Sequence, residues 1–161
     1  MDRPAQNPRA RLLAAVGAGA AALLLVLVPR YEGTVPKTYR DLGGILTACT
    51  GHTGPELKLG QTFTPAECEE LLSADLVKHS HGMQDCVDVP MTDGEVAAYT
   101  SFAFNVGVRA FCNSTMAHRL NMGDHPGACA ELSRWNKVGS RVLPGLVARR
   151  AAERKLCEGR A

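Results

Sequence analysis

The sequence predicts an α+β fold in which a small β wing is followed by a helical lobe. Glycines crowd the segment 35–54, which favours a twisted hairpin or a three-stranded wing over a helix. Two capping boxes follow, at 64–67 and 92–95, and each marks the start of a helix. A wing followed by helices, without alternating strand–helix units, is typical of the α+β class. An apolar run over residues 12–28 adds a helix before both parts.

The apolar run over residues 12–28 is typical of a membrane-directed helix. It holds six Leu, three Val, six Ala and two Gly. At ~1.5 Å per residue it spans ~26 Å, just short of a ~30 Å hydrocarbon core. Its Leu and Val residues supply only about −3 to −5 kcal/mol of insertion free energy. We therefore expect a weakly held signal anchor. A cleaved signal peptide is the alternative, because Ala18-Gly19-Ala20 and Ala20-Ala21-Ala22 fit a cleavage pattern.

The basic residues before the run predict its orientation. Arg3, Arg9 and Arg11 precede it, and Asp2 is the only acid there. The N-terminus is therefore expected to stay in the cytoplasm while the rest crosses outward. We therefore expect a tail at residues 1–11, an anchor at residues 12–28 and a folded domain at residues 29–161. That domain is large enough to bury an ordinary core.

The elements after the anchor follow from local signals. Gly33 fits the C-terminal glycine of a helix that ends near Glu32. Capping residues and proline place the starts of the later helices. These helices are expected from Thr64 to about His81, from Thr92 to near Gly107, from Ser114 to about Met122, from Asp124 through Trp135, and from about Pro144 to Cys157.

Six cysteines, all after the apolar run, predict three disulfides in an oxidising compartment. Fifteen pairings are possible, and the sequence does not choose among them. We predict Cys49–Cys68, Cys86–Cys112 and Cys129–Cys157, because each joins neighbours in the chain. Zinc is the alternative. Its only ligand-like spacings are Cys49-x-x-His52 and His79-x-His81, with no CxxC motif, so no metal is expected. The net charge of +2 gives no reason to expect nucleic-acid binding.

Two carboxylates and a hydroxyl lie close together in the sequence after the apolar run. Asp41 follows Glu32 by nine residues, and Thr47 follows Asp41 by six. Glycoside hydrolysis needs one carboxyl that donates a proton to the leaving oxygen and one ionised carboxylate that activates water or attacks. Glu32, where helix meets wing, is the candidate acid, Asp41 the ionised partner, and Thr47 a holder of the water. Taken alone this spacing is weak evidence, because Glu and Asp so placed on a soluble surface are usually just solvated.

The wider sequence resembles the phage-type lysozymes of glycoside hydrolase family 24. The pattern Glu-x8-Asp-x5-Thr is that family's catalytic signature, matched here by Glu32, Asp41 and Thr47. Three further segments match family motifs, at residues 50–54, 102–107 and 145–153. The resemblance implies a lysozyme-like fold with Glu32 as general acid, and Asp41 with Thr47 orienting the water. The implied substrate is the β-1,4 bond between N-acetylmuramic acid and N-acetylglucosamine in peptidoglycan, cleaved with inversion.

The N-terminus resembles the signal-anchor-release endolysins, a subset of that family. The resemblance implies a monomer that is single-pass in the bacterial inner membrane, is later released to the periplasm, depends functionally on a holin and needs no cofactor. The anchor has no cysteine and position 41 is Asp, which argues against activation by thiol exchange. Glu32 lies four residues past Val28, so anchoring should hold the acid at the bilayer. Release should then require the segment to refold in the domain as a helix leading to Glu32.

Three other residues are candidates for supporting roles, each with an alternative. We expect His52 to brace the wing, with proton transfer as the alternative. Arg149 or Arg150 is expected near Glu32, with a surface ion pair as the alternative. Two other functions also remain open. A lytic transglycosylase needs one acid and no water-orienting pair, and a membrane-tethered wall-binding module would cleave nothing.

Overall fold

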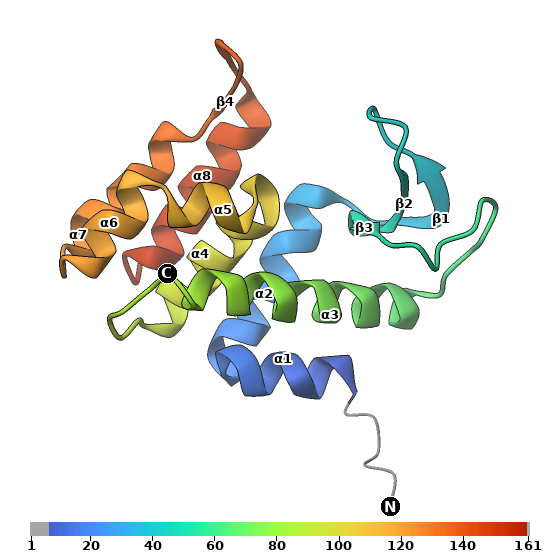
Figure 1. Ribbon diagram of the computed structural model, residues 1–161, viewed down its shortest axis with the longest axis horizontal. Coiled ribbons are helices and arrows are strands. Elements are labelled where there is room, and N and C mark those ends of the chain that lie inside the picture. The colour runs from blue at the N-terminus through green and yellow to red at the C-terminus, as the bar shows by residue number, and fades with distance from the viewer. Residues whose placement is uncertain (1–6, 161) are drawn as a thin grey trace, which may run out of the picture.

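The computed structural model describes residues 7–160 and has the predicted α+β architecture, with a helical lobe and a β wing on either side of the end of α2 (Figure 1). The long helix α3 runs beneath both parts. Residues 1–6 of the predicted cytoplasmic tail, with Asp2 and Arg3, lie outside the described residues. The elements are α1 (Pro8–Val16), α2 (Ala18–Glu32), β1 (Val35–Arg40), β2 (Leu46–Cys49), β3 (His52–Thr53), α3 (Pro65–Gln84), α4 (Asp93–Val106), α5 (Val108–Cys112), α6 (Thr115–Asn121), α7 (His125–Glu131), a 3-10 turn (Leu132–Arg134), β4 (Lys137–Val138), β5 (Arg141–Val142) and α8 (Pro144–Cys157).

The apolar run is not the single, separate N-terminal helix that the sequence predicted. Gly17, with φ 84° and ψ 161°, ends α1 and precedes α2. The two helices are bent by 118° at that break, and no single helix within residues 7–160 is long and apolar enough to cross a membrane. The φ of Gly17 lies in the left-handed region, which glycine adopts without steric cost. The structure therefore shows the run as two helices and does not show a separate anchor helix, which stays a prediction.

The run instead forms part of the hydrophobic core. Side chains of α1 and α2 pack against α3 and α4 in one cluster, which contains Leu12, Val16, Ala20, Ala21, Leu24, Val28, Leu72, Leu76, Val77 and Ala97. Full burial of one Leu or Val side chain stabilises a fold by about 1.5–3 kcal/mol. A handful of such side chains can therefore compete with a membrane insertion worth about −3 to −5 kcal/mol. α2 continues through Pro29 to Glu32, and Gly33, with φ 73°, ends it as expected.

The wing is an antiparallel sheet with strand order β1-β2-β3. Thr47 lies opposite Tyr39 on one side and opposite Thr53 on the other. The disulfide between Cys49 and Cys68 joins β2 to the first turn of α3. The strands of this sheet are short, and the sheet is held against α3 by the disulfide as well as by a small apolar cluster between them.

The helical lobe is built around α4, whose aromatic side chains Tyr99 and Phe102 are fully buried with Phe111 of α5. Both predicted capping boxes are present, at Thr64 with Glu67 and at Thr92 with Glu95. The sequence did not predict α5 or the hairpin of β4 and β5. Two-residue strands are too short to show an alternating pattern, and α5 restarts directly after the glycine that ends α4.

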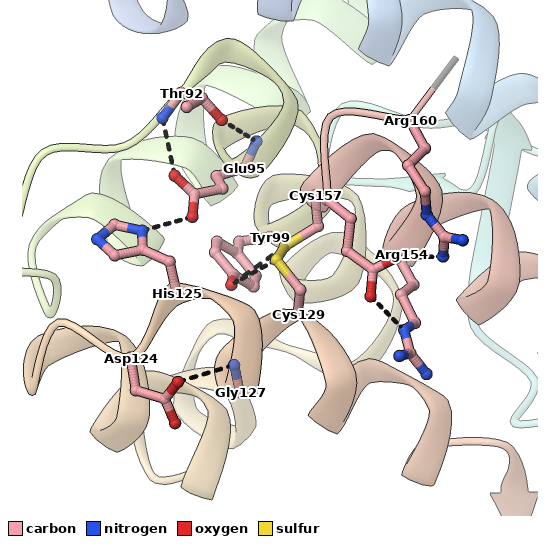
Figure 2. Close-up of a disulfide and its surroundings, with 11 residues drawn as sticks. Thr92, Glu95, Tyr99, Asp124, His125, Gly127, Cys129, Arg154, Cys157 and Arg160 are labelled. Atoms are coloured by element: carbon pink, nitrogen blue, oxygen red, sulfur yellow. Dashed lines mark hydrogen bonds and ion pairs between the residues drawn. A yellow bond between two sulfur atoms is a disulfide. The ribbon is translucent and has the colours of Figure 1, made fainter.

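The structure contains the three predicted disulfides, Cys49–Cys68, Cys86–Cys112 and Cys129–Cys157. Figure 2 shows the third bond, which joins α7 to α8 in the core. The Tyr99 hydroxyl lies 3.2 Å from Sγ of Cys157 and 3.7 Å from Sγ of Cys129. Because disulfide sulfurs carry no proton, this hydroxyl is the donor. Burial, with a smaller contribution from Glu95, raises the pKa of Tyr99, so the hydroxyl stays protonated.

We expect the double variant Cys129→Ala/Cys157→Ala to lose about 2–4 kcal/mol of unfolding free energy, because the bond closes a loop in the unfolded chain. Urea denaturation measures the loss. The matched variant Cys49→Ala/Cys68→Ala removes a disulfide that closes a shorter loop (sequence separation 19 against 28). On loop entropy alone, its loss of unfolding free energy should therefore not be larger. Free thiols found by non-reducing peptide mapping of the oxidised, exported protein would contradict the pairing.

Candidate active site

Glu32 is the last residue of α2, where the helical lobe meets the wing. Gly33 and Thr34 follow it, and β1 begins at Val35. Its side chain is 24% exposed, and its carboxylate forms an ion pair with the guanidinium of Arg149. The helix that is membrane-like in sequence therefore sets the position of this carboxylate directly.

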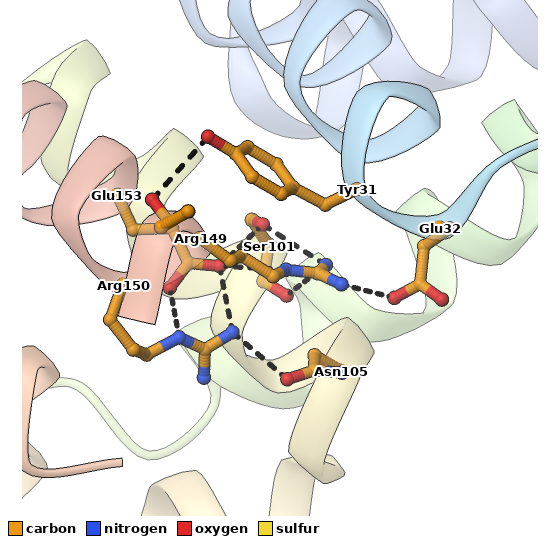
Figure 3. A network of polar contacts seen from close by, with 8 residues as sticks. Tyr31, Glu32, Ser101, Asn105, Arg149, Arg150 and Glu153 are labelled. Carbon is orange, nitrogen blue, oxygen red and sulfur yellow. Dashed lines mark hydrogen bonds and ion pairs between the residues drawn. The ribbon is translucent and has the colours of Figure 1, made fainter. Parts of the chain in front are cut away.

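Arg149 is a buried residue of α8 that holds Glu32 from the lobe side (Figure 3). Its Nη1 donates to Glu32, and its Nη2 donates to the Ser101 carbonyl oxygen at 3.2 Å. Its Nε donates to Glu153 at 3.2 Å. Every nitrogen of this guanidinium thus has an acceptor. Of the two candidate arginines, Arg149 is the neighbour of Glu32, while Arg150 contacts Asn105 and Glu153.

Asp41 begins the turn between β1 and β2 and shapes it with one carboxylate oxygen. Oδ1 of Asp41 accepts from the backbone N–H groups of Gly43 and Ile45, each at 2.9 Å. The Asp41 N–H in turn donates to the Ile45 carbonyl at 3.0 Å. Hydrogen bonds within the turn therefore engage Oδ1, while Oδ2 accepts no hydrogen bond from residues 7–160.

Thr47 lies on β2, is only 4% exposed, and is fixed by the same turn. Its hydroxyl donates to the Ile45 carbonyl at 3.0 Å. A hydroxyl that has donated its proton keeps lone pairs that can accept from a water molecule. Ile45 thus links Asp41 and Thr47, which lie together on the wing as the sequence predicted.

Glu32 and the pair Asp41 and Thr47 come from different segments. Thr34, two residues after Glu32, contacts Thr50 of the wing through their hydroxyls at 3.2 Å. Within residues 7–160, no hydrogen bond or ion pair joins Glu32 to Asp41 or Thr47. Carboxylates that flank a sugar and a water are expected to stand apart in this way.

His52 lies between two carboxylates and joins the wing to α3. Its Nδ1 lies 2.8 Å from Asp75 Oδ2 on α3, and its Nε2 lies 2.6 Å from Glu56 Oε1. Burial alone lowers the pKa of His52, but the hydrogen bonds and charges of Glu56 and Asp75 outweigh it, and the net shift is upward from 6.5. Both ring nitrogens are engaged, which favours the bracing interpretation over proton transfer.

The His52 brace predicts a pH-dependent stability. Because the folded-state pKa is raised, the stabilisation is fully present below pH 6.5 and is lost as pH rises through the folded pKa. Asp75→Asn should therefore lose most stability relative to wild type below pH 6.5 and little at alkaline pH. Glu56→Gln is the matched control, and because Glu56 is 58% exposed its loss should be smaller. Thermal unfolding across pH tests this, and an Asp75→Asn deficit that grows with pH would contradict it.

Sequence reasoning missed the buried partners of the arginines. Ser101 and Asn105 are polar positions four residues apart on α4, and both make hydrogen bonds to arginines of α8. Glu153 follows Arg149 by four residues, a spacing that pairs opposite charges on one helix face. These two spacings are the sequence features that could have predicted a buried polar contact between α4 and α8.

Metal binding finds no support in the described part of the chain. No group of three or more His, Cys, Asp and Glu side chains within residues 7–160 is placed to hold a metal ion. Cys49, the first residue of the Cys49-x-x-His52 spacing, is in a disulfide.

A helical lobe and a wing with an acid at their junction define a lysozyme-type glycosidase. The family model of phage lysozyme matches residues 29–153. The SAR-endolysin of bacteriophage PS119 is 37% identical, over 95% of this chain and 96% of that protein. The muramidase domain of SpmX from Asticaccaulis excentricus is 26% identical with a TM-score of 0.78, over 88% of this chain and 95% of that one. A mutant of P22 lysozyme is 30% identical with a TM-score of 0.72, over 97% and 98%. The chain belongs to the phage lysozyme family, and its similarity to a SAR-endolysin along nearly its whole length confirms the predicted subset.

Proposed function

We propose that this protein is an endolysin that hydrolyses the β-1,4 bond between N-acetylmuramic acid and N-acetylglucosamine in peptidoglycan, and so lyses the host cell. The observation that carries the proposal is the position of Glu32. It ends α2, is held by Arg149 from the helical lobe, and stands at the edge of the wing that presents Asp41 and Thr47. Family membership supports the same chemistry.

In the proposed reaction, Glu32 at the end of α2 acts on the leaving group, and Asp41 and Thr47 on the wing act on the water. Glu32 in its protonated form donates to the leaving oxygen. Asp41 accepts a proton from the attacking water through its free oxygen, while the Thr47 hydroxyl accepts a second hydrogen bond from that water. Because Ile45 fixes both side chains, the water is held before substrate binds, and little reorganisation is needed in the transition state.

A lytic transglycosylase is the second candidate, and a wall-binding module is the third. The engaged Oδ1 and free Oδ2 of Asp41, next to a hydroxyl with a free acceptor, favour hydrolysis, because a transglycosylase needs no such water site. Mass spectrometry of digested peptidoglycan separates the three. We expect new reducing ends. Anhydro ends would indicate a transglycosylase, and intact glycan strands a binding module.

We further propose that residues 12–28 act first as a weak inner-membrane anchor, with the domain in the periplasm, and are released uncleaved. The packing of this run in the core gives the released chain a place to bury it. Membrane depolarisation by a holin is the proposed trigger, and the released enzyme is proposed to act as a monomer. While the run spans the bilayer, α2 cannot present Glu32 to the wing as it does here.

Because the apolar run packs in the core, a variant that tests its release from the membrane must not disturb the folded domain. Gly17 has a left-handed φ, and a side chain on Gly19 would meet Asp93 Oδ2 at 2.2 Å. Leucine at Gly17 would therefore strengthen anchoring and strain the folded domain together, and leucine at Gly19 would also displace the Asp93 side chain. Ala22 is exposed on α2, so Ala22→Leu should delay lysis and enrich the membrane fraction without loss of purified-domain activity. Soluble protein that begins at residue 23 or later would instead show cleavage by signal peptidase.

A further inference from the structure

The helix α8 carries a second carboxylate that the proposed reaction does not use. Glu153 is completely buried beneath Arg149 (Figure 3). Its Oε1 accepts from the Ser101 hydroxyl at 2.7 Å, from Arg149 Nε at 3.2 Å and from Arg150 Nη2 at 3.1 Å. Glu153 therefore contacts the residue that holds Glu32 without contacting Glu32 itself.

Arg150 is equally buried and depends on Glu153 for its charge balance. Its Nη2 donates to Asn105 at 2.9 Å, and its guanidinium lies 4.8 Å from the centre of the Phe102 ring. Its Nε lies 2.8 Å from Glu153 Oε2, within ion-pair range, although the alignment does not make a hydrogen bond. Burial lowers the pKa of Arg150, and the charge of Glu153 opposes that shift. A buried charge without a partner is strongly destabilising, so this carboxylate is required where it stands.

The charges of this cluster act together on Glu32. Arg149 and Arg150 on α8 bring two positive charges, and Glu153 removes one of them. The groups from α4, Ser101 and Asn105, are polar but uncharged. One net positive charge therefore faces Glu32 on α2. Without the charge of Glu153, two would face it.

We propose that Glu153 is a positioning residue for the acid Glu32. Acting through Arg149, it fixes the guanidinium that holds the Glu32 carboxylate and limits the positive charge that faces it to one. The proposal rests on the proposed function, since it assigns Glu32 the role of proton donor.

The proposal predicts shifts of opposite sign in two variants. A proton donor must be protonated, and added positive charge nearby favours its ionised form. Glu153→Gln keeps an oxygen for Ser101 but removes the negative charge, so its activity should fall off toward alkaline pH about one unit earlier than that of wild type. Arg150→Gln removes a positive charge, so its fall-off should move to higher pH. The double variant should lie near wild type, because both charges are gone.

The experiment compares the pH dependence of wall turbidity loss at saturating wall concentration and constant ionic strength. Circular dichroism confirms that each variant is folded at each pH. Glu158→Gln is the matched control, because it also loses a carboxylate paired with an arginine of α8, yet lies near the surface, away from Glu32. Its pH profile should match that of wild type.

We expect the alkaline fall-off of activity to move in opposite directions in Glu153→Gln and Arg150→Gln, and to stay near that of wild type in the double variant. Profiles that coincide with wild type in the folded single variants, or shifts in the same direction, overturn the proposal. If one single variant does not fold, the direction of the pH shift in the other one supports the proposal when it is the predicted direction and overturns it otherwise. If only the double variant folds, a displaced profile overturns the proposal and an unchanged one supports it. An active Glu32→Gln enzyme would instead overturn the proposed function, whatever the Glu153 variants do.

Discussion

Glu32→Gln should reduce wall hydrolysis by about 10²- to 10⁴-fold, the range typical for loss of a general acid. The amide has nearly the same shape as the carboxyl but cannot donate an acidic proton to the leaving oxygen. Its Oε1 can still accept from Arg149, so the link from α2 to α8 should persist. Turbidity loss of purified walls measures the activity, and thermal unfolding measures the fold.

The structure supplies a matched control for this substitution. Glu158→Gln makes the same chemical change in a carboxylate that is also paired with an arginine of α8, at 2.7 Å from Arg154. We expect near wild-type hydrolysis from this control. Lysis by Glu32→Gln at a rate close to that of wild type would remove Glu32 from the reaction and leave the site unassigned.

Asp41→Asn should also be severely impaired, by about 10²-fold or more, because water activation needs the negative charge. The asparagine oxygen can replace Oδ1 as acceptor for Gly43 and Ile45, so the turn should survive. The unfolding free energy should therefore stay near that of wild type.

Asp41→Ala separates the two roles of this residue. It removes the charge and both hydrogen bonds of the turn, which typically contribute about 0.5–1.5 kcal/mol each. We expect it to lose activity as Asp41→Asn does, and to lose stability in addition. If Asp41→Asn were fully active while Asp41→Ala were not, the residue would act only by shaping the wing.

Local signals made much of the fold predictable. Thr64 with Glu67 and Thr92 with Glu95 form the expected capping boxes, because each needs only residues three positions apart. The glycines of 35–54 likewise predicted the wing. The break at Gly17 was not predictable, because the same apolar run is suited to a bilayer and to a protein core. Which of the two it occupies depends on α3 and α4, which lie far away in the sequence.

The catalytic roles of the site residues stay predictions, and the side chains that contact them were less predictable than the residues themselves. Glu32, Asp41 and Thr47 follow from their spacing and the family resemblance. The contact between Glu32 and Arg149 spans 117 positions, and only the packing of both α2 and α8 against α4 brings the two residues together. The contacts of Ser101 and Glu153 depend on the same packing. The sequence spacing therefore suggests that Arg149 and Glu153 pair on one face of α8, but it does not show that this face contacts Glu32.

The most direct test of the account is the anomeric form of the first product. If Asp41 and Thr47 hold the water on the face opposite Glu32, hydrolysis inverts the configuration of the β-linked sugar. Proton NMR of soluble, uncross-linked glycan strands during early digestion should therefore show the α-anomer first, before mutarotation. The β-anomer appearing first would contradict the account, because it would mean that a nucleophile and not a held water attacks the anomeric carbon.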